Sequence, residues 1–283
     1  MRTNGLAFKL TVSGTLTAAA IIIAHLLTQN IPIFGIPGLR ISFHGPFLQF
    51  ISVIIGPVFG GMAYAIRDLV GFLLGGEGAF LWQLMIVDFC CGVAIGFLWY
   101  KLKNVNVNVK WFTIGFGVIF FCLFLLFGVL NLVLLRSGHL LDILGGVSVN
   151  AGIVDSATWG LISTGLAGLA AMLLCHVLFH FIYRNSQDKD EKLQRVFRLL
   201  IAVGIPTILV TFVNSFILYR VMGGAPQAFV FFMITRLIRR VFTVFYDVYI
   251  LTALVSVYEQ VFKRQTKRVA VASASQDSST KKI

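Results

Sequence analysis

Long apolar blocks follow one another along almost the whole chain, and they constrain its fold more than any other feature. Bounded by charged residues, glycines and prolines, the blocks are residues 6–27, 46–55, 57–74, 80–100, 111–135, 153–183, 196–219 and 226–258. A helix needs roughly 20 apolar residues to cross about 30 Å of hydrocarbon. Block 46–55 is too short to cross alone and meets the next block at Gly56-Pro57, so we expect a short or tilted membrane helix there.

The composition supports a lipid environment, because only 12% of the residues are charged and 58% are hydrophobic. A soluble globular chain carries about 25% charged residues, so this chain lacks the polar surface that water on all sides requires. We therefore predict an all-α membrane protein, a polytopic helical bundle with about eight transmembrane helices.

Basic residues are distributed unevenly among the gaps between these blocks. Lys and Arg in short loops concentrate on the cytoplasmic side, so we place the N-terminus, with Arg2 and Lys9, in the cytoplasm. The inner gaps and the tail then hold Lys101, Lys103, Lys110, Arg184, Lys189, Lys192, Arg195, Arg198, Lys263, Arg264, Lys267 and Arg268. The outer gaps hold only Arg40, Arg136 and Arg220, which predicts that both termini are cytoplasmic.

The formal net charge of +12 does not indicate a nucleic-acid partner. Nucleic-acid binding requires a basic face on a folded domain, whereas these basic residues lie in short polar gaps. The four cysteines all lie within apolar blocks, without a CxxC pair. Buried free cysteine behaves as a small hydrophobe, so we expect no disulfide, no metal site and no cofactor.

Three stretches carry a resemblance to a known family. The first block contains Ala20 and Ala24, one helical turn apart. The second stretch contains four motifs: Gly38-Leu39-Arg40-Ile41-Ser42-Phe43, Gly56-Pro57-Val58-Phe59-Gly60-Gly61, Arg67-Asp68-Leu69-Val70-Gly71 and Gly78-Ala79-Phe80. The third stretch contains three: Asn214-Ser215-Phe216-Ile217-Leu218-Tyr219, Gly223-Gly224-Ala225-Pro226 and Thr235-Arg236-Leu237-Ile238. Together they resemble the S components of energy-coupling-factor (ECF) vitamin transporters, and the folate-type branch most.

The resemblance implies a substrate-binding subunit in a prokaryotic plasma membrane that captures a vitamin, with a folate-like molecule as the first guess. Its partners would be a transmembrane coupling protein, docked on Ala20 and Ala24, and two ATPase subunits. Small residues one turn apart let helices approach closely in lipid. The chain itself lacks the phosphate-binding pattern GxxxxGK[ST], so we expect no enzymatic activity of its own.

The chain departs from this family in its middle. The family has six helices, whereas blocks 111–135 and 153–183 add about two. We divide the chain into four parts: S-component-like helices in 1–103, an inserted helix pair with a cytoplasmic linker in 104–191, two further S-component-like helices in 192–262, and a disordered cytoplasmic tail in 263–283. An even insertion preserves the topology of the helices that follow it.

Charged residues inside the blocks are the first candidates for a site, because ionisable groups within hydrocarbon usually face a cavity or a partner. Arg67, Asp68 and Asp88 lie in the third and fourth blocks, and Arg239 lies in the last block. In the last block, Arg236, Arg240, Thr243 and Asp247 recur at helical spacing and share a face. We predict that Arg236 and Arg240 receive an anionic group of the ligand. The alternative is that they only pair with Asp68, Asp88 or Asp247, or extend to the membrane surface.

Loop residues on the outer side complete the predicted site. The resemblance implies that Arg40, His44, Trp82 and Gln83 lie in loops that gate the pocket, and that Asn214 contributes from the next-to-last block. Aromatic and amide groups suit a flat heteroaromatic vitamin. The alternative for Trp82 is an interfacial anchor, and for His44 an ordinary loop residue. His176 and His180 are four residues apart, and we interpret them as interfacial residues rather than a metal pair.

Two other classes of function stay open. An ion-coupled secondary carrier would place broken helices and inverted repeats around the midplane, but no convincing repeat is present. An intramembrane enzyme would need acid, base or metal groups converging at one depth. Here the histidines lie toward the inner side and Asp68, Asp88 and Arg236 toward the outer side, so this alternative is weaker.

Overall fold

The computed structural model describes residues 5–26, 29–33, 36–41, 44–75, 80–106, 189–222 and 239–261, with scattered residues between 115 and 181 and between 233 and 237. By length and composition, four described helices can cross a membrane: α1 (Leu6–Leu26), α4 (Trp82–Leu102), residues Asp190–Val221 of α8 (Lys189–Met222), and a last helix, Arg239–Val261. The chain is thus a multi-pass helical membrane protein. The number of eight crossings stays a prediction, because most residues of blocks 111–135 and 153–183 lie outside the described ones.

The short block forms the short helix that its length predicts. Helix α2 (Gly45–Phe50) continues directly into a π-helical turn, η1 (Ile51–Ile55). Gly56 ends the turn with a φ of 133°, a left-handed conformation that glycine adopts without steric cost. Helix α3 (Pro57–Leu73) begins at the next residue, where proline is favoured because its missing N–H has no helical partner. The chain therefore turns back on itself at Gly56-Pro57, as predicted.

A small β-hairpin lies between α1 and α2 of the otherwise helical structure. Strands β1 (Gln29–Ile33) and β2 (Ile36–Ile41) pair antiparallel, with Asn30 opposite Arg40 and an irregularity at Pro32. We expected only a loop here. The isoleucines of both strands favour extended backbone, and prolines in each strand disfavour a helix, so the segment forms a hairpin instead.

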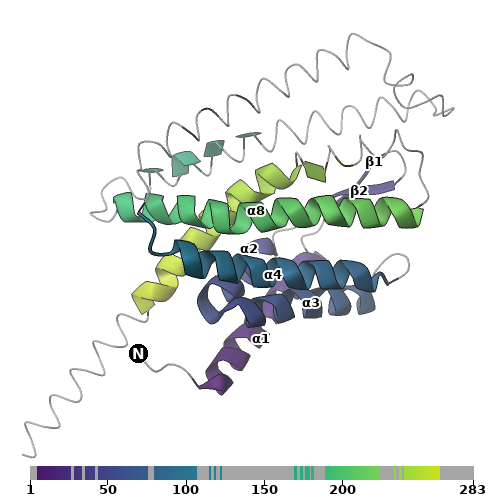
Figure 1. Ribbon diagram of the computed structural model, residues 1–283, viewed down its shortest axis with the longest axis horizontal. Helices are drawn as coiled ribbons and strands as arrows, with labels where there is room; N and C mark the ends of the chain where they lie inside the picture. Colours follow the sequence, from purple (N-terminus) through teal and green to yellow (C-terminus); the bar gives the residue numbers. More distant parts are fainter. Residues whose placement is uncertain are drawn as a thin grey trace, which may run out of the picture.

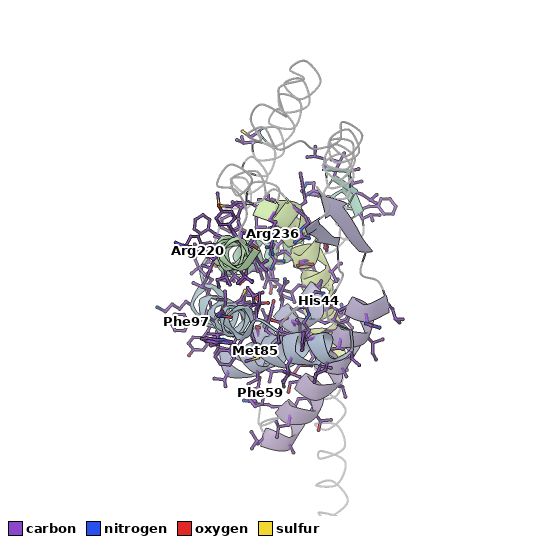
Figure 2. The ribbon with its side chains drawn as sticks, turned by 90° about the vertical axis from the view of Figure 1, so that its right-hand side faces the viewer. His44, Phe59, Met85, Phe97, Arg220 and Arg236 are labelled. Atoms are coloured by element: carbon purple, nitrogen blue, oxygen red, sulfur yellow. The ribbon has the colours of Figure 1, made fainter. Side chains whose placement is uncertain are left out.

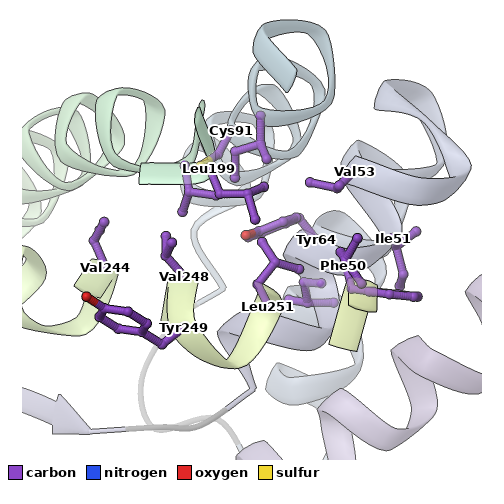
Figure 3. Packing of buried hydrophobic residues seen from close by; sticks show 14 of the residues in the cluster. Phe50, Ile51, Val53, Tyr64, Cys91, Leu199, Val244, Val248, Tyr249 and Leu251 are labelled. Atoms are coloured by element: carbon purple, nitrogen blue, oxygen red, sulfur yellow. The ribbon is translucent and has the colours of Figure 1, made fainter. Parts of the chain in front are cut away.

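The helices are arranged around α4, which packs against α3 on one side and α8 on the other (Figure 1). Helix α1 packs against α3 and α2, and the last helix crosses the bundle at a steep angle in Figure 1. The core lies where these elements meet, and Figure 3 shows Tyr64, Leu199, Val248 and Leu251 converging from α3, α8 and the last helix. Outward-facing side chains of α3, such as Met62 and Ile66, are apolar and exposed, as a lipid-facing surface requires.

Glycines bring α3 and α4 into backbone contact. A Cβ on Gly92 would lie 2.7 Å from the carbonyl of Gly60, and a Cβ on Gly96 would lie 2.6 Å from the Cα of Pro57. A Cβ on Gly61 would lie 2.7 Å from Val93. No larger side chain fits at these positions without moving a helix. Since lipid offers no hydrophobic driving force between helices, close packing of this kind holds the pair together.

Candidate functional site

Asp247 on the last helix is the most deeply buried acid of the described residues, with 3% of its surface exposed. Gln49 of α2, 1% exposed, donates a hydrogen bond from Nε2 to Asp247 Oδ2 at 2.9 Å. A Cβ on Gly45 would lie 2.6 Å from the same carboxylate oxygen. Gly45 thus leaves space for a carboxylate at the start of α2, where backbone N–H groups lack helical partners and favour negative charge.

A second polar contact joins α4 to α8. Asn214 donates a hydrogen bond from Nδ2 to Asp88 Oδ1 at 3.1 Å. Asp88 also interacts with Asp68 of the neighbouring helix α3, whose carboxylate forms an ion pair with the adjacent Arg67. Two carboxyl groups and an amide therefore meet where three helices pack together.

Arginines at the start of the last helix and just before it connect these two contacts. Arg240 interacts electrostatically with Asp247 and with the buried Tyr64 of α3. Arg236 interacts electrostatically with Asp88 and with Arg240. In Figure 2, Arg236 lies toward the middle of the bundle, whereas Arg220 and Phe97 lie at its outer edge. We call the set formed by Gln49, Asp68, Asp88, Asn214, Arg236, Arg240 and Asp247 the buried polar network.

Some buried acceptor atoms of this network lack a hydrogen-bond partner among the described residues. Gln49 Oε1, Asn214 Oδ1 and Asp247 Oδ1 are buried and have no hydrogen-bond partner among the described residues. A buried polar atom without a partner costs about 1 to 3 kcal/mol. These atoms are therefore suited to accept hydrogen bonds from a group that is not part of the described chain.

The structure brings together four of the predicted substrate-binding residues. Asp88, Asn214, Arg236 and Arg240 all belong to the buried polar network. Gln83 lies one turn and a half before Asp88 on α4, and its Oε1 is also buried without a partner among the described residues. Their role in binding a substrate stays a prediction.

The three remaining predicted residues lie at the starts of helices or in the hairpin. Trp82 begins α4 with 57% of its surface exposed, which fits the alternative of an interfacial anchor. His44 occupies the N-cap position of α2 without a side-chain capping bond. Arg40 lies in β2, and its side chain is outside the described residues.

Sequence reasoning missed Gln49, Gly45 and Tyr64. A signal for Gln49 was present, because it is the one amide in the apolar block 46–55, and a polar group in such a block needs a partner. Gly45 and Tyr64 gave no signal, since their roles depend on which helix lies opposite. Asp247 was identified as sharing a face with Arg236 and Arg240, but it was not assigned to the site.

Ala20 and Ala24 are buried against other helices of this chain. Ala20 is 0% exposed and Ala24 is 7% exposed, in a helix that packs on α3 and α2. The small-residue pattern therefore serves packing inside the bundle here. Docking of a separate subunit on these two alanines stays a prediction, and it would require displacing these contacts.

His176 contacts the last helix. Its Nδ1 lies 2.7 Å from the hydroxyl of Tyr249, and its ring lies 4.7 Å from that of His180. No group of three His, Cys, Asp or Glu side chains suited to a metal ion occurs among the described residues. This contact joins His176 to the last helix.

Comparison of the chain with protein families, with characterised proteins and with solved structures found no match. Any functional conclusion therefore depends on the chain's own residues and their geometry.

Proposed function

We propose that this protein is the membrane-embedded substrate-binding subunit of an ECF-type vitamin importer. The observation that supports the proposal most directly is the buried polar network, which joins α2, α3, α4, α8 and the last helix inside an otherwise apolar bundle. Ionisable residues at such depth are costly and usually serve a site or a pathway.

The depth of the network supports a site open to one side of the membrane. Asp88 lies six residues into α4, about 9 Å from its start, and Asn214 lies eight residues before the end of α8, about 12 Å from it. Arg236 and Arg240 lie around the start of the last helix. The starts of α4 and of the last helix and the end of α8 lie on the hairpin side of the bundle (Figure 1).

The opposite end of the bundle carries the basic residues of the predicted inner gaps. Arg198 Nη1 donates to the Lys103 carbonyl at 2.7 Å, and Arg195 pairs with Glu259 of the last helix at 2.9 Å. Basic residues favour the cytoplasmic side, so we assign this end to the cytoplasm. The buried polar network would then face the outside, where an importer captures its substrate.

The residues of the network support one ligand class. Arg236 and Arg240 suit a carboxylate, because guanidinium groups form strong, directional hydrogen bonds to it. The open oxygens of Gln49, Asn214 and Asp247 suit adjacent N–H donors of a heteroaromatic ring. A flat ring with ring N–H groups and a carboxylate tail, as in folate-like vitamins, satisfies both requirements. In this role the protein would hydrolyse no ATP, and a coupling protein with two ATPase subunits would drive release.

Purification followed by mass spectrometry of co-purifying small molecules tests the ligand class directly. We expect a heteroaromatic carboxylate bound to the wild type and lost in Arg236→Ala, with Arg220→Ala as the matched control at the bundle's edge. Two results together would contradict the proposed role of Arg236 in ligand binding. The wild type would carry no such molecule, and Arg236→Ala would bind added folate as tightly as the wild type does.

Transport assays separate this proposal from its main alternative. In proteoliposomes we expect uptake only when the coupling protein and ATPases are present with ATP. Uptake driven by an ion gradient without these partners would instead indicate a secondary carrier.

A further inference from the structure

We propose that the cytoplasm-facing end of α4 is a binding site for the phosphate of an anionic phospholipid, formed by Lys101 and Lys103 with Phe97 and Tyr100. Lys101 Nζ lies 4.6 Å from the centroid of the Phe97 ring, and Lys103 Nζ lies 4.5 Å from that of Tyr100. Each ammonium group is thus held over an aromatic face, which attracts cations. We call these four residues the lysine–aromatic cluster.

The position of the cluster along α4 matches the membrane surface. Exposed side chains follow one face of this helix, beginning at Trp82 and continuing through Ile86 and Phe97 to Tyr100, which is 69% exposed. Trp82 and Tyr100 are 18 residues apart, about 27 Å of helix, which is close to the thickness of the hydrocarbon core. Amphipathic aromatic residues such as Trp and Tyr gather at the two membrane interfaces, so Lys101 and Lys103 lie at the level of the headgroups.

The two lysines differ from the nearby arginines because they are available to bind an anion. Arg195 pairs with Glu191 and Glu259, and Arg198 donates to Gln194 and to a backbone carbonyl. Within the described ranges, neither Lys101 nor Lys103 has a carboxylate within 4 Å, and both are exposed. Two uncompensated cations at headgroup level, beside exposed rings that can contact acyl chains, complement a lipid with an anionic phosphate.

The helix end adds to this charge complementarity by fixing the position of the lysines. Lys101 lies in the last turn of α4 and Lys103 is its C-cap residue, where the partial negative charge of the free carbonyls favours cations. The carbonyl of Lys103 is also held by Arg198 Nη1 at 2.7 Å. The lysines are therefore placed by α4 and α8 together, at a defined point on the surface.

Titration of phosphatidylglycerol into the full chain in zwitterionic detergent, read by native mass spectrometry, tests the site. A basic residue near an anionic surface contributes about fivefold in affinity, so the double variant Lys101→Gln, Lys103→Gln should bind the lipid about 30-fold more weakly. The matched control is Arg220→Gln, which removes a cation stacked on Phe216 at the other end of the bundle. This control should retain wild-type affinity, and Lys101→Arg, Lys103→Arg should restore most of the binding.

Three results would overturn the proposal. The first is wild-type affinity for phosphatidylglycerol in the double glutamine variant, and the second is an equal loss in Arg220→Gln. The third is displacement of the lipid by inorganic phosphate at concentrations comparable to the lipid, which would assign the site to a soluble anion. High salt should weaken lipid binding to the wild type, because exposed charges are screened, and binding that does not change with salt would also contradict the proposal.

Discussion

Gly92 of α4 lies against Gly60 of α3, so close that a Cβ on Gly92 would be 2.7 Å from both atoms of the Gly60 carbonyl group. Backbone cannot give way as a flexible side chain does, so Gly92→Ala must push the two helices apart. Overpacking of this kind costs about 1 to 3 kcal/mol. We expect the free energy of unfolding to decrease by this amount, measured by reversible unfolding in mixed micelles.

Gly71→Ala is the matched control for this prediction. It lies in α3, and a Cβ there would have no atom within 4 Å. Alanine in a helix is favoured over glycine by about 0.5 to 1 kcal/mol, so this variant should be neutral or slightly stabilising. Equal destabilisation by both substitutions would show that the helix contact is not the cause.

A second prediction concerns Gly45 and Asp247. Gly45→Ala places a methyl group 2.6 Å from the Asp247 carboxylate, so the substitution should displace the acid and weaken its bond with Gln49. We expect a loss of about 1 to 3 kcal/mol in the free energy of unfolding. The same substitution made in an Asp247→Ala background should cost much less, because the obstructing group is gone.

A double-mutant cycle measures this relationship. Contacting residues usually show a coupling free energy of at least about 0.5 kcal/mol. A value near zero for Gly45→Ala and Asp247→Ala would therefore contradict the observed contact. A coupling of the expected sign would locate Asp247 at the start of α2 in the membrane-embedded protein.

Periodicity and block length predicted the helical elements well where each element is determined locally. Block 80–100 became α4 (Trp82–Leu102), and the Gly56-Pro57 turn appeared where two residues with strong backbone preferences meet. Helix α8 begins at Lys189, before the predicted block 196–219 and before the boundary placed at 191/192. The polar residues there, including Glu191 and Arg195, are good helix formers, although low hydropathy alone predicts a linker at this position.

The site was less predictable because its contacts join residues far apart in sequence. Arg236, Arg240 and Asp88 could be selected as buried charges, since an ionisable group in an apolar block needs a partner. The acids named as their possible partners included Asp88, which interacts with Arg236, and Asp247, which interacts with Arg240. The contact of Gln49 with Asp247 could not be predicted, because the two residues are 198 positions apart and meet only through the crossing of α2 and the last helix. The hairpin was missed for a different reason, since its strands are short and interrupted by prolines.

The Asp88–Asn214 hydrogen bond gives a third prediction. Inside membranes such bonds contribute about 0.6 kcal/mol on average and up to about 1.7 kcal/mol. A double-mutant cycle with Asp88→Ala and Asn214→Ala should give a coupling in this range, measured as free energy of unfolding. Asn214→Ala combined with Lys101→Ala is the control pair, because Lys101 lies at the other end of α4, and these two changes should be additive.

The fourth prediction concerns Arg195, which joins α8 to the last helix through Glu259 at 2.9 Å. Glu259 is partly exposed, with 43% of its side chain accessible, so the pair is weak and screened by salt. Glu259→Gln should lower the free energy of unfolding by less than about 1 kcal/mol at low salt, and the difference from the wild type should vanish at high salt. Glu191→Gln should have a smaller effect still, because its contact with Arg195 is longer, at 3.5 Å, and more exposed. A loss that persisted unchanged at high salt would mean that Glu259 acts through packing of the helix end rather than through its charge.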